Sequence, residues 1–162
     1  MKLIICEKLS LAKTVSKAIG IEKWEDGYVK CKNDYIVTWG KGHLFQLYDV
    51  DDYEGKKMKW EEISLPYIPE KYLYRIRDDK KTKQKDIEAE KQFKRIGKIL
   101  KDYDISSIIN CGDADREGQI IVDIIMDQLN WNGNRERLWL PEQTEQTIRR
   151  QLAKLENNEK YI

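Results

Sequence analysis

The hydrophobic pattern of the chain centres on a short apolar run at residues 105–111 that stops abruptly at three acids. The run is continuous, rich in β-branched residues and bounded by polar positions, which predicts a buried strand rather than a helix. Asp113, Asp115 and Glu117 follow it at alternate positions, and the apolar segment 119–126 after them predicts the next helix. The strand is therefore expected to deliver three carboxylates into a strand-to-helix turn.

A second apolar run, residues 3–6, ends in the same way on Glu7 and Lys8. A helix is expected to follow it, with Ser10 as the N-cap and Gly20 as the stop. In an α/β sheet, ligands bind outside the carboxyl ends of the parallel strands. The pattern therefore predicts that Glu7 lies beside the three acids.

The rest of the chain alternates strand-like and helix-like segments, so the expected fold class is an α/β sandwich with a largely parallel central sheet flanked by helices. The strands and helices are expected at residues 28–31, 35–39, 72–76, 137–140, 87–100 and 142–155. We expect one domain over residues 1–140, in which 48–85 form an irregular, partly basic excursion. Residues 141–162 are expected to form a helix that leads toward a following domain.

Composition and cysteine usage are those of a soluble globular protein of a reducing compartment. Hydrophobic residues make up 40% and charged residues 36% of the chain, and no apolar run approaches the roughly 18 residues that a membrane span needs. Cys6, Cys31 and Cys111 are odd in number and form no Cys-x-x-Cys pair, which favours buried thiols over disulfides or zinc. A cytoplasmic protein without a membrane partner is therefore expected.

Positive charge is concentrated between residues 71 and 101, where twelve lysines and arginines stand against five acids. This local net charge of +7 contrasts with +1 for the whole chain. A solvated lysine-rich face is the alternative, but a basic cluster also neutralises DNA phosphates, which supply most non-specific affinity. The lysines most suited to DNA binding lie in a charged loop: Lys80, Lys81, Lys83 and Lys85.

Three acids held within one turn repel one another, so a fold that gathers them is expected to use a cation. Ligands that offer only oxygen favour a hard ion such as Mg²⁺. The alternative is a solvated acidic turn in which Asp113 caps the next helix. The second charged strand end, at Glu7, favours the metal site.

Glu7-Lys8-x-Ser10 after a first strand, followed by Asp-Ala-Asp-Arg-Glu-Gly at residues 113–118, resembles the Toprim domain of type IA DNA topoisomerases. Glu-Lys in place of Glu-Ser-Pro indicates the topoisomerase III branch. Further segments resemble the same family: Val37-Thr38-Trp39, Gly42-His43-Leu44, Trp60, Leu65-Pro66, Arg137-Leu138-Trp139-Leu140 and Thr144-x-x-Thr147-Ile148-Arg149. The resemblance also implies the Rossmann-like Toprim fold.

The chain departs from the family at two positions and lacks one motif. Leu9 stands where the family usually has proline, and Gln119 where it usually has glutamate, so the acidic cluster carries one charge fewer. None of the nine tyrosines lies in a Tyr-Pro-Arg-Thr-like motif, the family's nucleophile. The chain thus resembles an N-terminal piece of a topoisomerase and is expected to be inactive alone in relaxation.

The resemblance implies a role for each site residue. Glu7 would shuttle the proton of the reacting DNA oxygen and Lys8 would act on the phosphate, while Asp113, Asp115 and Glu117 would hold Mg²⁺. Arg116 would pair with the acids or with a backbone phosphate, and the single histidine, His43, is given no catalytic role. The implied partners are a single-stranded DNA segment and the remaining topoisomerase domains with the catalytic tyrosine.

Two other classes stay open at this point. One is a free-standing Toprim enzyme of the nuclease or primase type, which would use the same acids without a partner tyrosine. The other is a non-catalytic Toprim module that binds DNA. Nicking of supercoiled plasmid in the presence of Mg²⁺ or Mn²⁺ would distinguish them.

Overall fold

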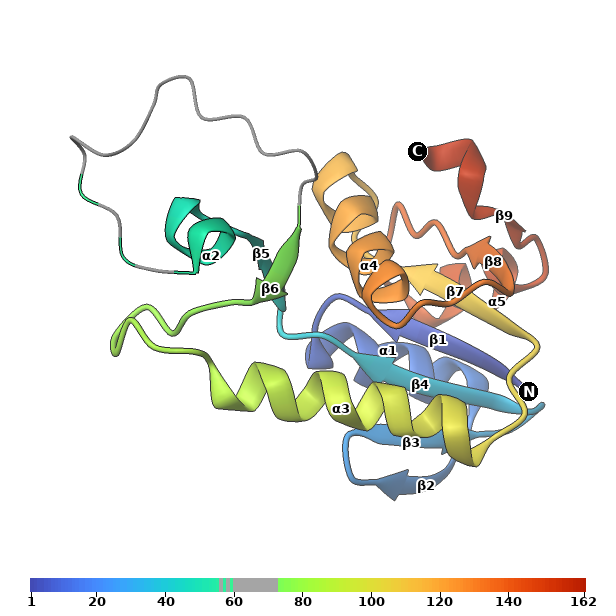
Figure 1. Ribbon diagram of the computed structural model, residues 1–162. Coiled ribbons are helices and arrows are strands. Elements are labelled where there is room, and N and C mark those ends of the chain that lie inside the picture. The colour runs from blue at the N-terminus through green and yellow to red at the C-terminus, as the bar shows by residue number, and fades with distance from the viewer. Residues whose placement is uncertain (56, 58, 60–72) are drawn as a thin grey trace.

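The computed structural model describes residues 1–55, 57, 59 and 73–162, which are built around one seven-stranded sheet (Figure 1). Its strands run in the order β2-β3-β4-β1-β7-β8-β9. Strands β4, β1, β7 and β8 pair in parallel, and antiparallel strands complete both edges. The bounds are β1 Lys2–Cys6, β2 Ile21–Glu25, β3 Tyr28–Cys31, β4 Tyr35–Trp39, β7 Ser107–Cys111, β8 Asn134–Arg137 and β9 Glu156–Asn157. The predicted α/β class with a largely parallel sheet is confirmed.

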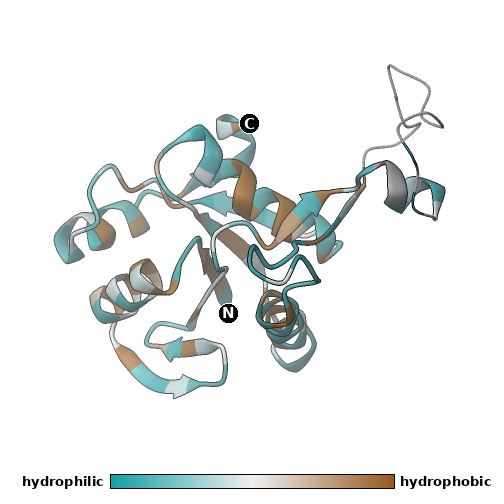
Figure 2. Ribbon diagram, turned by 90° about the vertical axis from the view of Figure 1, so that its left-hand side faces the viewer, coloured by the Kyte–Doolittle hydropathy of each residue, from teal (hydrophilic) through white to brown (hydrophobic). Residues whose placement is uncertain are grey.

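Helices cover both faces of this sheet, so its strands are enclosed on either side (Figure 2). Helices α1 (Leu9–Ile19) and α5 (Glu145–Leu152) pack on one face. Helices α3 (Ile87–Asp102) and α4 (Arg116–Gln128) pack on the other. Four parallel strands therefore end at one edge of a sandwich whose interior is filled, which is where α/β proteins place their ligands.

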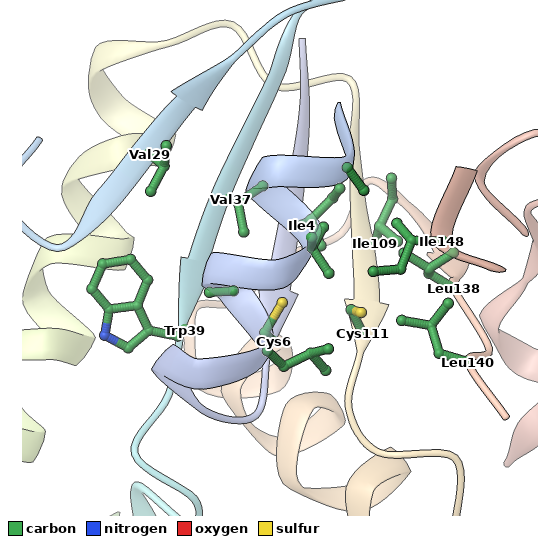
Figure 3. Packing of buried hydrophobic residues seen from close by; sticks show 14 of the residues in the cluster. Ile4, Cys6, Val29, Val37, Trp39, Ile109, Cys111, Leu138, Leu140 and Ile148 are labelled. Carbon is green, nitrogen blue, oxygen red and sulfur yellow. The ribbon is translucent and has the colours of Figure 1, made fainter. Parts of the chain in front are cut away.

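Burial on both faces explains why the two diagnostic runs are continuously apolar rather than alternating. In β1, Ile4 and Cys6 face α1, whereas Leu3 and Ile5 face α3 and α4, and all four are fully buried. Figure 3 shows Ile4 and Cys6 in the α1-side core, and Cys111 of β7 lies in the same cluster. All three cysteines of the chain are buried and free, as predicted from the apolar context of two of them.

A smaller unit lies beside the main sheet and includes part of the expected irregular excursion. Strands β5 (Phe45–Leu47) and β6 (Tyr74–Ile76) pair antiparallel, and the short helix α2 (Val50–Glu54) lies between them in the sequence. Arg75 joins its parts through hydrogen bonds to Asp52 (2.7 Å) and Asp78 (2.8 Å). The family-like residues Trp60, Leu65 and Pro66 lie outside the described residues.

Two predicted boundaries near the ends of strands are wrong, for reasons that the structure makes clear. The connection from β1 to α1 is only two residues long, so Ser10 lies inside the helix, and Lys8 is an N-cap without a side-chain bond. The strand expected at residues 137–140 is β8, which ends at Arg137. Leu138 and Leu140 follow the strand and are buried in the core, and the N–H of Leu138 donates the last backbone hydrogen bond to β7, at Asn110 (3.0 Å). Hydrophobicity marked burial there, whereas backbone pairing falls on the polar residues that precede it.

The C-terminal part differs most from expectation. The helix expected at residues 142–155 is confined to α5, and the chain then returns to the sheet as β9 and ends in the 3-10 helix η2 (Asn158–Tyr161). Strand β2 was not predicted because most of its side chains are exposed, leaving no apolar face to detect. Across the described parts of the chain, we find no helix with the length and hydrophobicity to cross a membrane.

Candidate active site

The two charged strand ends predicted from the sequence meet at one edge of the sheet. Cys6 and Cys111 are direct partners in the parallel pair β1–β7, so Glu7 and Asp113 leave the sheet side by side. They open into a cavity of about 280 Å³. Its lining residues are Glu7, Lys8, Gly42, His43, Asp113, Asp115, Glu117 and Ile121. The structure therefore gathers five of the predicted site residues in one place.

The acid loop, residues 112–118, can form only because glycine occupies two of its positions. A Cβ atom on Gly112 would overlap the backbone of Gly118, and one on Gly118 would overlap the backbone of Asp113. The loop consequently folds back on the first turn of α4, whose N-cap is Asp115. The alternative reading that Asp113 caps this helix is wrong, because Asp115 accepts the hydrogen bond from the backbone N–H of Gly118 at 2.6 Å.

Glu7 is the most deeply buried carboxyl group of the cavity, with only 6% of the residue exposed. Burial, a hydrogen bond to the Asp113 side chain and the charge of Asp113 together raise the pKa of Glu7 from 4.5 to about 7. The Lys8 ammonium, 4.0 Å from the Glu7 carboxylate, acts in the opposite sense. Glu7 can therefore take up and release a proton near neutral pH, which a general acid or base requires.

The other three acids are each engaged with a donor of the protein. Asp115 caps α4, Glu117 contacts Nε2 of His43 at 3.0 Å, and Asp113 accepts a hydrogen bond from Gln143 at 3.4 Å. Among the described residues, no three His, Cys, Asp or Glu side chains converge closely enough to hold a metal ion. The carboxylates share a cavity, but they do not form a finished ligand cage.

His43, to which the sequence analysis gave no catalytic role, lines the cavity, and Arg77, which it did not single out, supports the loop that carries His43. Arg77 donates hydrogen bonds to the backbone carbonyls of Lys41 (2.7 Å) and His43 (2.8 Å), and its Nε donates to Asp86 at 3.0 Å. Arg77 thereby fixes the loop that carries His43 against Glu117. The Gly42-His43-Leu44 motif drew attention to this loop, but nothing in the sequence linked it to Arg77.

Of the predicted DNA-binding residues, Lys8 lines the cavity with the acids, whereas the others lie outside it. Arg116 begins α4 and is exposed. The loop between Asp78 and Lys85 is closed by a β-bridge, and the Asp79 side chain accepts from the N–H groups of residues 81 and 82. The four lysines of this loop are all exposed, and they do not line the cavity: Lys80, Lys81, Lys83 and Lys85.

The family resemblance placed Gln119 in the acidic cluster, where the family usually has glutamate. In the structure, Gln119 does not line the cavity that holds these acids. Its side chain is buried and turns toward Asp123 and Asn158, to each of which its Nε2 donates at 2.8 Å. The cavity therefore loses no ligand through the glutamine.

Comparison with known proteins agrees with this architecture. The family model described as Toprim domain matches residues 2–143. A DNA topoisomerase 3 of Vibrio cholerae is 33% identical over 166 residues, covering 99% of this chain and 24% of that protein. A DNA topoisomerase 3 of Bacillus cereus is also 33% identical, over 98% of this chain and 20% of its own length.

A solved structure gives the same result at the level of the fold. Full-length topoisomerase I of Thermotoga maritima superposes with a TM-score of 0.56 at 20% identity, covering 99% of this chain and 22% of that one. The chain thus spans between a fifth and a quarter of the length of these relatives. Taken with the match over residues 2–143, these similarities show that the chain belongs to the Toprim domain family.

Proposed function

We propose that this chain is the Toprim portion of a Mg²⁺-dependent type IA DNA topoisomerase of the topoisomerase III kind. The observation that carries the proposal is the pairing of β1 with β7, which sets Glu7 and Lys8 beside Asp113 in one cavity. The relatives named DNA topoisomerase 3, which match nearly the whole chain, favour this branch. The cytoplasm is the proposed location, in keeping with three buried free thiols.

Glu7 is proposed to handle the proton of the DNA oxygen that leaves and later returns. In a type IA reaction, a tyrosine attacks a backbone phosphate and releases a 3′ hydroxyl, which then reseals the strand. That tyrosine would come from a part of the enzyme outside these residues. Glu7 suits the proton transfer because its pKa of about 7 leaves both protonation states populated at neutral pH.

Asp113, Asp115 and Glu117 are proposed to hold Mg²⁺. They fit the ion in kind, because all three offer hard carboxylate oxygens at the edge of one cavity. Side-chain rotations must bring them together, since the described acids do not converge as they stand. When bound, the ion would neutralise and orient the phosphate of the DNA strand.

Lys8, Arg116 and the lysine loop are proposed to bind the DNA backbone at different distances from the reacting phosphate. Lys8 lies in the cavity with its side chain largely exposed, so its ammonium can reach a non-bridging phosphate oxygen. Arg116, at the exposed start of α4, would contact a neighbouring phosphate. The four loop lysines would add salt-dependent affinity away from the cavity for a single-stranded segment.

Metal titration tests the proposed site directly. We expect Mn²⁺, followed by electron paramagnetic resonance, to bind weakly to the purified chain. An Asp113→Ala, Asp115→Ala double variant should lose this binding, whereas Glu22→Ala, which removes an exposed acid of β2, should keep it. Equal affinity in all three proteins would refute the assignment of the acids.

A plasmid assay separates the proposed function from the alternatives. The chain alone should neither relax supercoiled plasmid nor form a covalent DNA adduct, because neither Glu7 nor the acids supply a nucleophilic hydroxyl. Mg²⁺-dependent nicking abolished by Asp113→Ala would instead identify a free-standing nuclease. Relaxation by the chain alone would overturn the division of labour proposed here.

A further inference from the structure

The back of the acid loop is held by two buried networks that both reach the C-terminal segment, residues 156–161. This segment comprises β9 and η2, and it lies beside β8 (Figure 1). Apart from Asp113, the residues of these networks are not among those that line the cavity. They are therefore positioned to set the shape of the loop without touching a ligand.

The first network is built on Arg137, the last residue of β8, which is 1% exposed. Its Nη1 donates to the carbonyl oxygens of Asn110 (3.0 Å) and Gly112 (2.8 Å), and its Nη2 donates to that of Asp113 (2.9 Å). One planar guanidinium thus fixes three carbonyls across the point where β7 becomes the acid loop. Because the fork is rigid, these bonds determine the path of the backbone that carries the Asp113 carboxylate.

The C-terminal segment supports this guanidinium through an aromatic pair. The rings of Trp139 and Tyr161 are stacked with centroids 4.9 Å apart. The Arg137 guanidinium carbon lies 4.8 Å from the Trp139 centroid and 5.9 Å from that of Tyr161. Tyr161 therefore packs against the group that orders the acid loop.

The second network starts at Asn158, a residue of η2 that is 1% exposed. Asn158 donates to Asp123 at 2.7 Å and accepts from Gln119 at 2.8 Å. The same Asp123 oxygen accepts from Asn110 at 3.3 Å, and the Asn110 side-chain oxygen accepts from the N–H of Gly112 at 2.9 Å. A continuous chain of hydrogen bonds thus joins the C-terminal segment to the first residue of the acid loop.

We propose that the C-terminal segment is a positioning element of the candidate metal site, acting on Asp113 through Asn158 and Tyr161. The inference rests on the proposed role of the acids as metal ligands. Loss of Asn158 removes one hydrogen-bond partner from each of the buried side chains of Asp123 and Gln119, which weakens the chain of bonds that ends at Gly112. Loss of Tyr161 removes the outer ring of the stacked pair beside the Arg137 guanidinium. Outer groups that orient metal ligands typically change metal affinity by roughly 10–100-fold when they are removed.

Asn158→Ala tests the hydrogen-bonded network with two measurements. Hydrogen exchange at the Gly112 amide, read by NMR without metal, should accelerate by about tenfold, as expected when a hydrogen bond is weakened. Mn²⁺ affinity should fall by roughly 10–100-fold. Lys160→Ala is the matched control, because it removes only an exposed ion pair with Glu156 in the same segment, and it should change neither quantity.

A second variant keeps the inference testable if Asn158→Ala fails to fold. Tyr161→Leu removes the stacked ring but leaves the buried amide network intact, and it should weaken Mn²⁺ binding and shift the Asp113 amide resonance. Unchanged Gly112 exchange and unchanged Mn²⁺ affinity in the folded variants would overturn the inference. If instead the wild type and the Asp113→Ala, Asp115→Ala variant bind Mn²⁺ equally, the proposed metal site fails, and Gly112 exchange alone decides the positioning role.

Discussion

Glu7→Gln is expected to stabilise the metal-free chain, although it removes the group proposed for proton transfer. Glutamine keeps the shape of the side chain but cannot ionise. In the wild type, burial and Asp113 raise the pKa of Glu7 from 4.5 to about 7. Ionisation therefore costs more free energy in the folded chain than in the unfolded one, and the substitution removes that cost.

The sign and magnitude follow from proton linkage. A raised carboxyl pKa means that the folded state binds more protons, so wild-type stability falls as the pH rises from 4.5 toward 7 and is level above that. The difference between 4.5 and 7 corresponds to about 3 kcal/mol at about 1.36 kcal/mol for each pH unit. We expect Glu7→Gln to gain about 2–3 kcal/mol at pH 8 and almost nothing at pH 4.5.

Urea unfolding followed by tryptophan fluorescence, with EDTA present, measures this gain at both pH values. Glu22→Gln is the control, since Glu22 is exposed on β2 and its substitution should leave stability unchanged at either pH. A gain of equal size at pH 4.5 and pH 8 would show that packing, not ionisation, is responsible. Destabilisation at pH 8 would refute the reasoning about Glu7 altogether.

Three further outcomes are expected. Gly118→Ala should destabilise the chain by about 1–3 kcal/mol in urea unfolding, because the added methyl group would overlap the Asp113 backbone. Gly55→Ala is not a suitable control, because Gly55 has a positive φ and its substitution would itself strain the backbone. In the full-length topoisomerase proposed above, Glu7→Gln should slow plasmid relaxation by about 10²–10⁴-fold with DNA binding retained, and relaxation at the parental rate would count against proton transfer by Glu7. Neutralising the loop lysines should flatten the dependence of log K on log salt by about 0.9 for each lost phosphate contact on duplex DNA, or about 0.7 on single strands. An unchanged slope would make these residues only a solubilising surface: Lys80, Lys81, Lys83 and Lys85.

The sequence predicted the parts of the fold in which burial is continuous and local. Strands β1, β4 and β7 are buried on both faces and mostly apolar, so the sequence pattern predicted them directly. Strand β9 could not be predicted, because two exposed residues pair with β8 only through a long-range contact. The predicted position of β8 was wrong, because the residues of the strand are polar and the buried leucines follow its end.

The candidate site was predictable as far as it depends on strand order. Parallel neighbours bring Glu7 and Asp113 together, and this adjacency follows from two apolar runs ending in acids. The partners of the side chains were not predictable, because His43 is 74 residues from Glu117, and Asn158 is 39 residues from Gln119. Gln119 shows the limit most plainly, since its place in the motif indicated the acidic cluster, whereas its side chain points into a buried network.

The hydrogen bonds that now occupy the acids are compatible with the proposed metal site. A carboxylate has two oxygens with about four acceptor positions, so a side chain can keep one protein donor and still offer an oxygen to an ion. Asp115 could retain its bond to Gly118, and Glu117 its contact with His43, and each bond would then fix the orientation of a ligand. The cavity has more acidic than basic groups. Its described lining residues include four acids, whereas Lys8 and His43 are the basic residues among them. The raised pKa of Glu7 reflects the neighbouring carboxyl groups as well as burial. A cation that enters would relieve this repulsion, but with few protein ligands it would bind weakly until DNA phosphate oxygens complete its coordination.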